Sequence, residues 1–221
     1  MVNIEKYIQQ LIELLRKQFS SRLFYVGLQG SYLRGEANSD SDIDIMVVIA
    51  DLNVSDLTLY RKIINALEYS EKSCGFICST QDLCHWNPLE ICSLLHTTKD
   101  YYGTLREFIP DYSEADLRNF LKMSINNLYH ELCHRYIHSE FDKNYANLPL
   151  TYKSVFFILQ NLYFLKTKEF IGTKAALLTK MQGKDYEVLK RSLELANNTV
   201  YNFDESFELI FSWCQETLYS L

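Results

Sequence analysis

The chain has 221 residues, of which 48% are hydrophobic and 23% are charged, and its formal net charge is -6. This composition is that of an ordinary globular protein, and it excludes a disordered chain, which carries too few apolar residues to build a core. The acidic balance argues against a long nucleic-acid partner, because such proteins neutralise phosphates with a basic patch. A cationic small molecule would suit this charge better.

No apolar run reaches the roughly 18 residues that a membrane-spanning helix needs, so no membrane partner is expected. The first 22 residues form an amphipathic pattern without the apolar core or cleavage site of a signal peptide. Six cysteines without such a signal are typical of reduced thiols in a cytoplasmic protein. We therefore expect a cytoplasmic chain, and the sequence leaves its oligomeric state open.

Hydrophobic periodicity predicts a first half that mixes helices and strands. In chain order we expect a helix at 2–19, a strand at 22–28, a helical turn at 31–35, a strand at 42–49, a helix at 55–72, a strand at 74–78 and a helix at 89–96. Serines are the expected N-caps of several helices, because a hydroxyl can accept a hydrogen bond from a free backbone N–H. These caps are Ser31, Ser55, Ser79 and Ser113, with Ser79 and Asp82 at the spacing of a capping box.

Beyond about Tyr112 the strand pattern disappears, and the sequence predicts only helices. Their expected ranges are 113–138, 150–167, 173–181, 184–197 and 204–219. The sequence therefore predicts an α+β protein with two domains, a mixed αβ domain at 1–111 and a helical bundle at 112–221.

Two acidic residues stand at the start of the second predicted strand. Side chains alternate along a strand, so Asp42 and Asp44 share one face with apolar residues that follow, and the opposite face is apolar throughout. Adjacent carboxylates repel each other, and Mg²⁺ commonly takes one or two carboxylates together with substrate phosphates. The alternative is an acidic turn that merely leads into the strand.

The preceding residues favour the metal site over the acidic turn. Gly30 and Ser31 follow a strand and open a helical turn, where free N–H groups and a hydroxyl can bind an anion. Gly35 allows the chain to turn back tightly toward the second strand. A phosphate-binding turn beside a metal-binding strand is the arrangement that phosphoryl or nucleotidyl transfer requires.

The spacing G-S-x10-D-x-D, within the stretch GSYLRGEANSDSDID, resembles the nucleotidyltransferase superfamily built on the DNA polymerase beta-type palm. The order of a compact palm and a helical bundle is similar to that of the aminoglycoside and lincosamide nucleotidyltransferases. The resemblance implies a polymerase beta-like palm, with a mixed sheet flanked by helices, followed by a C-terminal helical bundle.

The resemblance also implies the roles of individual residues. Asp42 and Asp44 would bind one or two Mg²⁺ ions and serve catalysis, and Gly30 and Ser31 would hold the β- and γ-phosphates of a nucleoside triphosphate, most simply ATP. Lys153, the lone charge at the start of an apolar helix, would either meet the triphosphate or extend to solvent. The expected reaction moves AMP to a hydroxyl of a small molecule, such as an aminoglycoside, which would make the chain an antibiotic-resistance enzyme.

Two alternatives stay open at this point. The acceptor could be a protein side chain, as in antitoxin-type or regulatory adenylylation, or the chain could be an inactive nucleotide-binding or partner-binding module. The reason to consider an inactive module is that many members of the resembling family carry a third carboxylate on the neighbouring strand. The predicted strand CGFIC at 74–78 holds none. Glu71 and Asp82 flank that strand. For the general base, Glu131, Glu140 and Asp142 are candidates, and activation by metal alone would also suffice.

Overall fold

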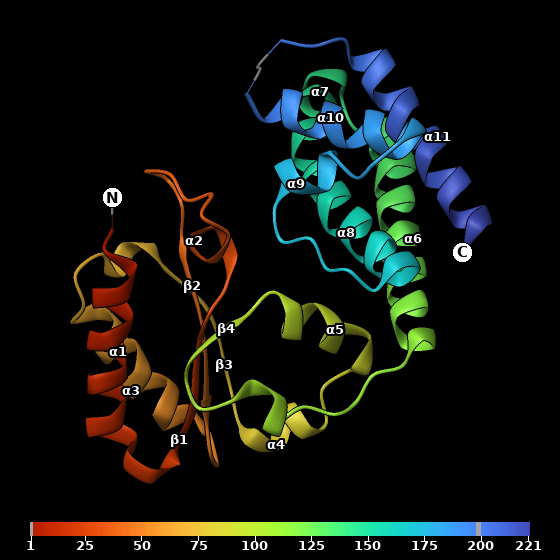
Figure 1. Ribbon diagram of the computed structural model, residues 1–221. Coiled ribbons are helices and arrows are strands. Elements are labelled where there is room, and N and C mark those ends of the chain that lie inside the picture. Colours follow the sequence, from red (N-terminus) through yellow and green to blue (C-terminus); the bar gives the residue numbers. More distant parts are fainter. Residues whose placement is uncertain (1, 198–199) are drawn as a thin grey trace. The chain divides into compact units, whose positions relative to one another are not determined.

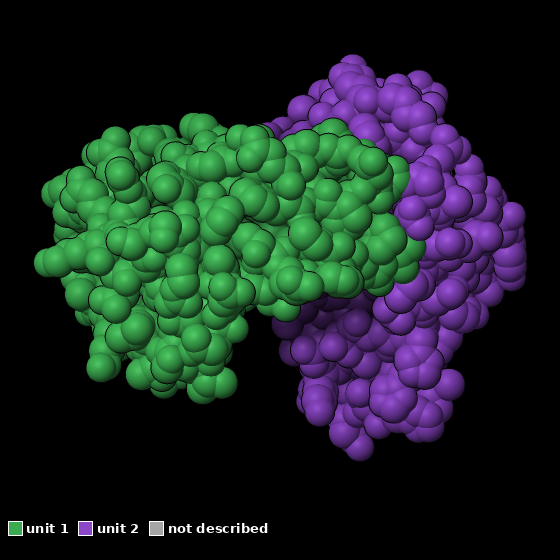
Figure 2. All heavy atoms as spheres, turned by 90° about the horizontal axis from the view of Figure 1, so that it is seen from below, with its two compact units in different colours: residues 1–112 green, residues 113–221 purple. Residues whose placement is uncertain are grey.

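The computed structural model describes residues 2–197 and 200–221. The chain divides into two compact units, Met1–Tyr112 and Ser113–Leu221, which Figure 2 distinguishes by colour. That each unit is a domain in its own right stays a prediction. Each unit is described below by itself.

Unit 1, residues 1–112, is built on a mixed four-stranded sheet with the strand order β3-β2-β1-β4. The central strand β1 runs antiparallel to β2 and β4, and β2 runs parallel to β3. The strands are β1 (Leu23–Leu28), β2 (Ile43–Ile49), β3 (Ser73–Cys78) and β4 (Lys99–Tyr102). The three predicted strands are confirmed. The sequence did not indicate β4, because four residues at a sheet edge are too short to show a periodic pattern.

Helices cover both faces of this sheet (Figure 1). The side chains of β2 alternate: Ile43, Ile45, Val47 and Ile49 pack with α1 and α3, and Met46 and Val48 pack on the opposite face with α4 and α5. The helices of unit 1 are α1 (Ile4–Phe19), α2 (Gly30–Arg34), α3 (Val54–Asn65), α4 (Thr80–Cys84) and α5 (Pro88–His96), with 3-10 turns η1 (Ser20–Arg22), η2 (Ser70–Lys72) and η3 (Leu105–Glu107).

The helix starts agree only in part with the predicted caps. Ser79 and Ser113 each form a capping box, as expected. Ser31 and Ser55 were wrong as caps, because α2 has Gln29 as its N-cap and α3 has Asn53, whose side chain accepts from the N–H groups of its first turn. The helix α3 also stops seven residues before the expected end, and the chain then takes a left-handed conformation at Tyr69 (φ 65°) on its way to β3.

Unit 2, residues 113–221, contains helices and no strand in the part of it that the structure describes. Its helices are α6 (Glu114–His138), α7 (Phe141–Thr151), α8 (Lys153–Thr167), α9 (Lys174–Leu178), α10 (Gly183–Asn197) and α11 (Phe203–Ser220). The central helix is α8, which packs against α6, α7 and α10 and buries most of its side chains. The sequence did not predict α7, since its N-cap Glu140 makes no capping bond and Pro149 interrupts its last turn.

Together the two units confirm the expected architecture, a mixed sheet flanked by helices followed by C-terminal helices. Across residues 2–197 and 200–221, no helix has both the length and the apolar character needed to cross a bilayer. All six cysteines are free thiols.

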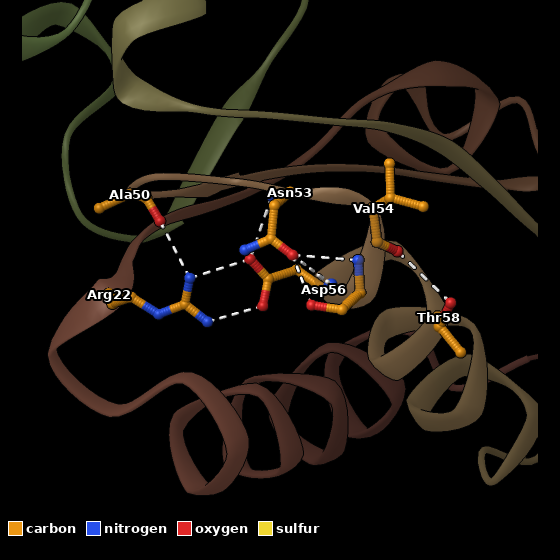
Figure 3. A network of polar contacts seen from close by, with 7 residues as sticks. Arg22, Ala50, Asn53, Val54, Asp56 and Thr58 are labelled. Atoms are coloured by element: carbon orange, nitrogen blue, oxygen red, sulfur yellow. Dashed lines mark hydrogen bonds and ion pairs between the residues drawn. The ribbon is translucent and has the colours of Figure 1, made fainter.

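An ion pair ties the start of α3 to the sheet (Figure 3). Two guanidinium nitrogens of Arg22 donate to the two carboxylate oxygens of Asp56, at 2.9 and 2.7 Å. Asp56 is only 2% exposed, and it also accepts from the backbone N–H of Asn53 at 3.2 Å. The hydrogen bonds from Arg22 are the main reason why the pKa of Asp56 is lowered. The pair therefore fixes where the chain enters β1 and where it enters α3.

Replacing Arg22 by alanine should lower the thermal unfolding midpoint, because it leaves the buried Asp56 carboxylate without its cation. The pKa of Asp56 is depressed in the folded state, so the contribution of the pair is complete above the usual aspartate value and disappears as the pH falls through the depressed one. Thermal unfolding at pH 7 and at pH 3 should therefore show a drop of several degrees at pH 7 and a smaller drop at pH 3. Arg61→Ala, at an exposed position of α3, is the control. Equal midpoints for both variants at pH 7 would contradict this role.

Candidate functional site

Four of the predicted site residues, Gly30, Ser31, Asp42 and Asp44, lie where β1 ends and β2 begins. Because the two strands are antiparallel, Leu28 at the end of β1 pairs with Ile45 near the start of β2. The backbone N–H of Gln29 extends this ladder by donating to the carbonyl oxygen of Asp44 at 2.8 Å. The next residues along the chain, Gly30 and Ser31, begin α2 (Gly30–Arg34), which packs against β2 (Figure 1).

Gly30 is in direct contact with the Asp44 carboxylate. A Cβ atom added at Gly30 would lie 1.9 Å from Oδ2 of Asp44 and 2.8 Å from its Cγ. The backbone of Gly30 also has φ +69°, which side chains rarely adopt. Gly35, at the other end of α2, has the same φ, but a Cβ there would meet no atom within 4 Å. Close approach to the carboxylate is therefore a property of Gly30 alone of these two glycines.

The start of α2 offers hydrogen-bond donors. The first N–H groups of a helix have no acceptor within the helix, and the N-cap residue Gln29 makes no side-chain cap. Its amide nitrogen instead donates to the hydroxyl of Thr98, at 2.8 Å. The N–H groups of the first turn and the half-buried hydroxyl of Ser31 are thus available to an anion next to Asp44.

The two carboxylates differ in their surroundings. Asp42 lies one residue before β2 and is exposed, whereas Asp44 is half-buried. Burial raises the pKa of Asp44 above the usual aspartate value; a hydrogen bond with Cys74 lowers it, the charge of Asp42 raises it, and the charge of Arg34 lowers it. The charge of Asp42 therefore acts on the Asp44 carboxylate two residues further along the chain.

On the neighbouring strand, a thiol takes the position beside Asp44. The parallel register pairs Asp44 with Cys74, and β3 carries no acidic residue. Asp82 lies beyond the far end of β3, and the strand from Cys74 to Cys78 alone spans about 13 Å. Its carboxylate also accepts from the backbone N–H of Ser79 at 2.8 Å, so Asp82 is excluded as a third ligand beside Asp44.

The carboxylates of Asp42 and Asp44 fit a hard divalent cation whose remaining ligands come from substrate phosphates and water. Among the described residues, no three histidine, cysteine, aspartate or glutamate side chains are grouped so that they could hold an ion. Asp42 and Asp44 nevertheless supply carboxylate oxygens next to the anion-binding turn. Mg²⁺ is commonly bound by one or two carboxylates plus phosphate oxygens and water, so a pair of aspartates is sufficient on the protein side.

Lys153 and the candidates for the general base lie in unit 2. Lys153 is the first residue of α8 and its side chain is exposed. Glu131 pairs with Arg135 at 2.8 Å and accepts from the hydroxyl of Thr151 at 2.8 Å, whereas Glu140 and Asp142 are exposed. The role of Lys153 on a triphosphate and the choice of a general base stay predictions.

Three residues of the site were not identified in the sequence: Gln29, Cys74 and Thr98. The parallel register of β2 and β3 would have placed Cys74 beside Asp44, since the strands themselves were predicted. No signal could have placed Thr98, because it precedes the unpredicted strand β4.

Asp44→Asn should stabilise the folded protein at neutral pH when divalent cations are chelated. The pKa of Asp44 is higher in the folded than in the unfolded state, so the stability of the parent falls as the pH rises from the unfolded value, about 3.8, through the folded one. An asparagine carries no charge and removes this loss. Thermal unfolding with EDTA should give Asp44→Asn a higher midpoint at pH 7 and little difference below pH 3.8. Asp40→Asn, at an exposed acid of the same loop, is the control, and an unchanged or lower midpoint for Asp44→Asn at pH 7 would contradict the inference.

Comparison with known proteins relates this chain to a protein family. A family model described as a nucleotidyltransferase domain matches residues 8–78, which include β1, α2, β2 and β3. A protein of Methanocaldococcus jannaschii, provisionally named a protein adenylyltransferase, is 35% identical in an alignment of 78 residues that covers 32% of this chain and 78% of that protein.

The fold of the whole chain is similar to that of a solved enzyme. The crystal structure of spectinomycin adenyltransferase from Enterococcus faecialis, with ATP and spectinomycin, superposes with a TM-score of 0.61 at 16% identity. The match covers 98% of this chain and 100% of that one, so the likeness extends through the C-terminal helices. With the Gly-Ser turn and the aspartate pair in one place, and with a relative that matches over most of its own length, the chain belongs to the nucleotidyltransferase superfamily and is an enzyme of adenylyltransferase-like fold.

Proposed function

We propose that this protein transfers AMP from ATP to a hydroxyl group of a small, positively charged molecule, in a reaction that depends on Mg²⁺. The observation that carries this proposal is the contact between Gly30 and the Asp44 carboxylate, which unites the anion-binding turn with the acidic pair. In the reaction the acceptor oxygen bonds to the α-phosphorus of ATP, the bond to the β-phosphate oxygen breaks, and pyrophosphate and a proton leave.

The chain's own groups would serve this reaction by binding and orientation. Asp42 and Asp44 would hold one or two Mg²⁺ ions, which neutralise phosphate charge and stabilise the attacking and leaving oxygens. The N–H groups at the start of α2 and the hydroxyl of Ser31 would bind the β- and γ-phosphates. Cys74 would keep the Asp44 carboxylate oriented through its hydrogen bond. Positioning and charge neutralisation supply most of the catalysis in this chemistry.

The charge of the chain and its fold support a cationic acceptor. The formal net charge of -6 favours encounter with a polycation. The neighbour of similar fold was solved with spectinomycin, an amine-bearing antibiotic, and we extend this acceptor class to the present chain as a proposal. A role in antibiotic resistance would follow from this acceptor.

A protein acceptor is the second candidate, and one observation favours it. The Methanocaldococcus jannaschii relative is provisionally named a protein adenylyltransferase, and it is 35% identical to a segment of this chain and is covered over 78% of its own length. The two candidates share the chemistry on ATP and differ only in the molecule that supplies the hydroxyl. A single labelling experiment can therefore distinguish them.

The test is transfer of label from α-labelled ATP in the presence of Mg²⁺. Aminoglycosides and aminocyclitols form one acceptor panel, analysed by chromatography, and purified proteins form the other, analysed on gels. Asp42→Asn and Asp44→Asn should each reduce transfer at least about 100-fold, because they remove groups that neutralise transition-state charge. Asp40→Asn, an exposed acid of the same loop, should retain activity. Undiminished transfer by either site variant would contradict the assignment, and ATP binding without pyrophosphate release on any acceptor would indicate an inactive nucleotide-binding module.

Gly30→Ala should abolish transfer while Gly35→Ala retains most of it. Both replacements impose a similar backbone strain, on the order of 1 kcal/mol, because both glycines have φ +69°. Only the methyl group at Gly30 would displace the Asp44 carboxylate. We expect at least a 100-fold loss for Gly30→Ala, like that of Asp44→Asn, and a change of only a few fold for Gly35→Ala. Steady-state rates measured below the unfolding midpoints of both variants check this, and equal losses for the two would mean that strain alone is responsible.

A further inference from the structure

The exposed side of α6 carries a row of three histidines that the proposed reaction does not use. His130, His134 and His138 follow one another at intervals of four residues, the spacing that places side chains on one face of a helix. The ring centroids of His130 and His134 are 6.1 Å apart, and those of His134 and His138 are 5.0 Å apart. All three side chains are exposed.

These rings are free to turn toward a ligand. Over residues 2–197 and 200–221, no hydrogen bond or ion pair engages the side chain of any of the three, whereas the side chains of Glu131 and Arg135 bind each other at 2.8 Å. The charged residues of the same helix segment thus satisfy one another. The imidazole nitrogens are left as the unused metal-binding groups of this face.

From this geometry we propose that His134 and His138 form a two-histidine chelate for a divalent transition-metal ion of the Cu²⁺, Ni²⁺ or Zn²⁺ class. A metal–nitrogen bond of about 2.0–2.1 Å places two rings on one ion with their centroids about 4.5–6 Å apart. The separation of 5.0 Å between His134 and His138 falls inside this range, and that of 6.1 Å between His130 and His134 lies just outside it. Water would complete the coordination.

The helix geometry limits the site to a pair. His130 and His138 are two turns apart, about 12 Å along the helix axis, so the three rings cannot share one ion. This agrees with the absence, among the described residues, of any group of three metal-binding side chains. His134 belongs to both neighbouring pairs and is the indispensable member.

Two features favour the pair at the C-terminal end. The rings of His134 and His138 are the closer pair, and His138 is the last residue of α6. The carbonyl end of a helix carries partial negative charge, which stabilises a bound cation within the last turn. Imidazole pairs prefer borderline transition ions to Mg²⁺, so this site would not compete with the aspartate pair of unit 1 for the same metal.

Titration of Ni²⁺ into the untagged full-length chain in excess Mg²⁺ tests the proposal. A Cys74→Ser, Cys84→Ser background removes the two exposed thiols as competing ligands. We expect one ion per chain by calorimetry and, by NMR, broadening of the imidazole signals of His134 and His138. His134→Ala and His138→Ala should each weaken binding at least tenfold, and alanine at these exposed helix positions keeps the helix intact.

His85→Ala is the control, since this exposed histidine lies in unit 1, and it should change the affinity less than twofold. Equal affinity in the parent and in His134→Ala would overturn the proposal. So would binding that is lost in His85→Ala but kept in His138→Ala. Circular dichroism of each variant confirms that α6 is folded when the affinities are compared.

Discussion

The site depends on one close contact, in which the carboxylate of Asp44 occupies the space that a side chain at residue 30 would need. The antiparallel register of β1 and β2 brings the end of one strand to the start of the other, and the bond from Gln29 to Asp44 continues it. The strand β2 cannot shift, because both its faces are packed, one against α1 and α3 and the other against α4 and α5. The sheet therefore holds the Asp44 carboxylate at the start of α2.

Holding the Asp44 carboxylate beside Asp42 in a half-buried position costs folding free energy. The same negative charge would attract a metal ion. Burial and the neighbouring Asp42 both raise the pKa of Asp44, which means that the folded chain holds its negative charge against an electrostatic penalty. A cation between the aspartates and a phosphate on the adjacent turn would relieve it. A metal-bound triphosphate would thus relieve the electrostatic penalty that Asp42 and Asp44 impose on the folded chain.

The sequence predicted this part of the molecule well because its signals are local. The alternation in DIDIMVVI predicted the strand, and Gly30-Ser31 marked the turn. The sequence did not predict elements whose formation depends on tertiary contacts. The edge strand β4 exists only because β1 offers it a partner, and α7 begins without a capping side chain. Cys74 lies beside Asp44 because of the register between β2 and β3, which the pattern within either strand does not encode.

We propose that the aspartate pair and the Gly-Ser turn bind one metal–triphosphate unit together. The most direct measurement is a crystal structure of the protein with Mn²⁺, for its anomalous signal, and a non-hydrolysable ATP analogue. We expect an anomalous peak between the carboxylates of Asp42 and Asp44, and triphosphate oxygens within hydrogen-bond distance of the N–H groups at the start of α2. A nucleotide bound elsewhere, or a metal that touches neither aspartate, would contradict it.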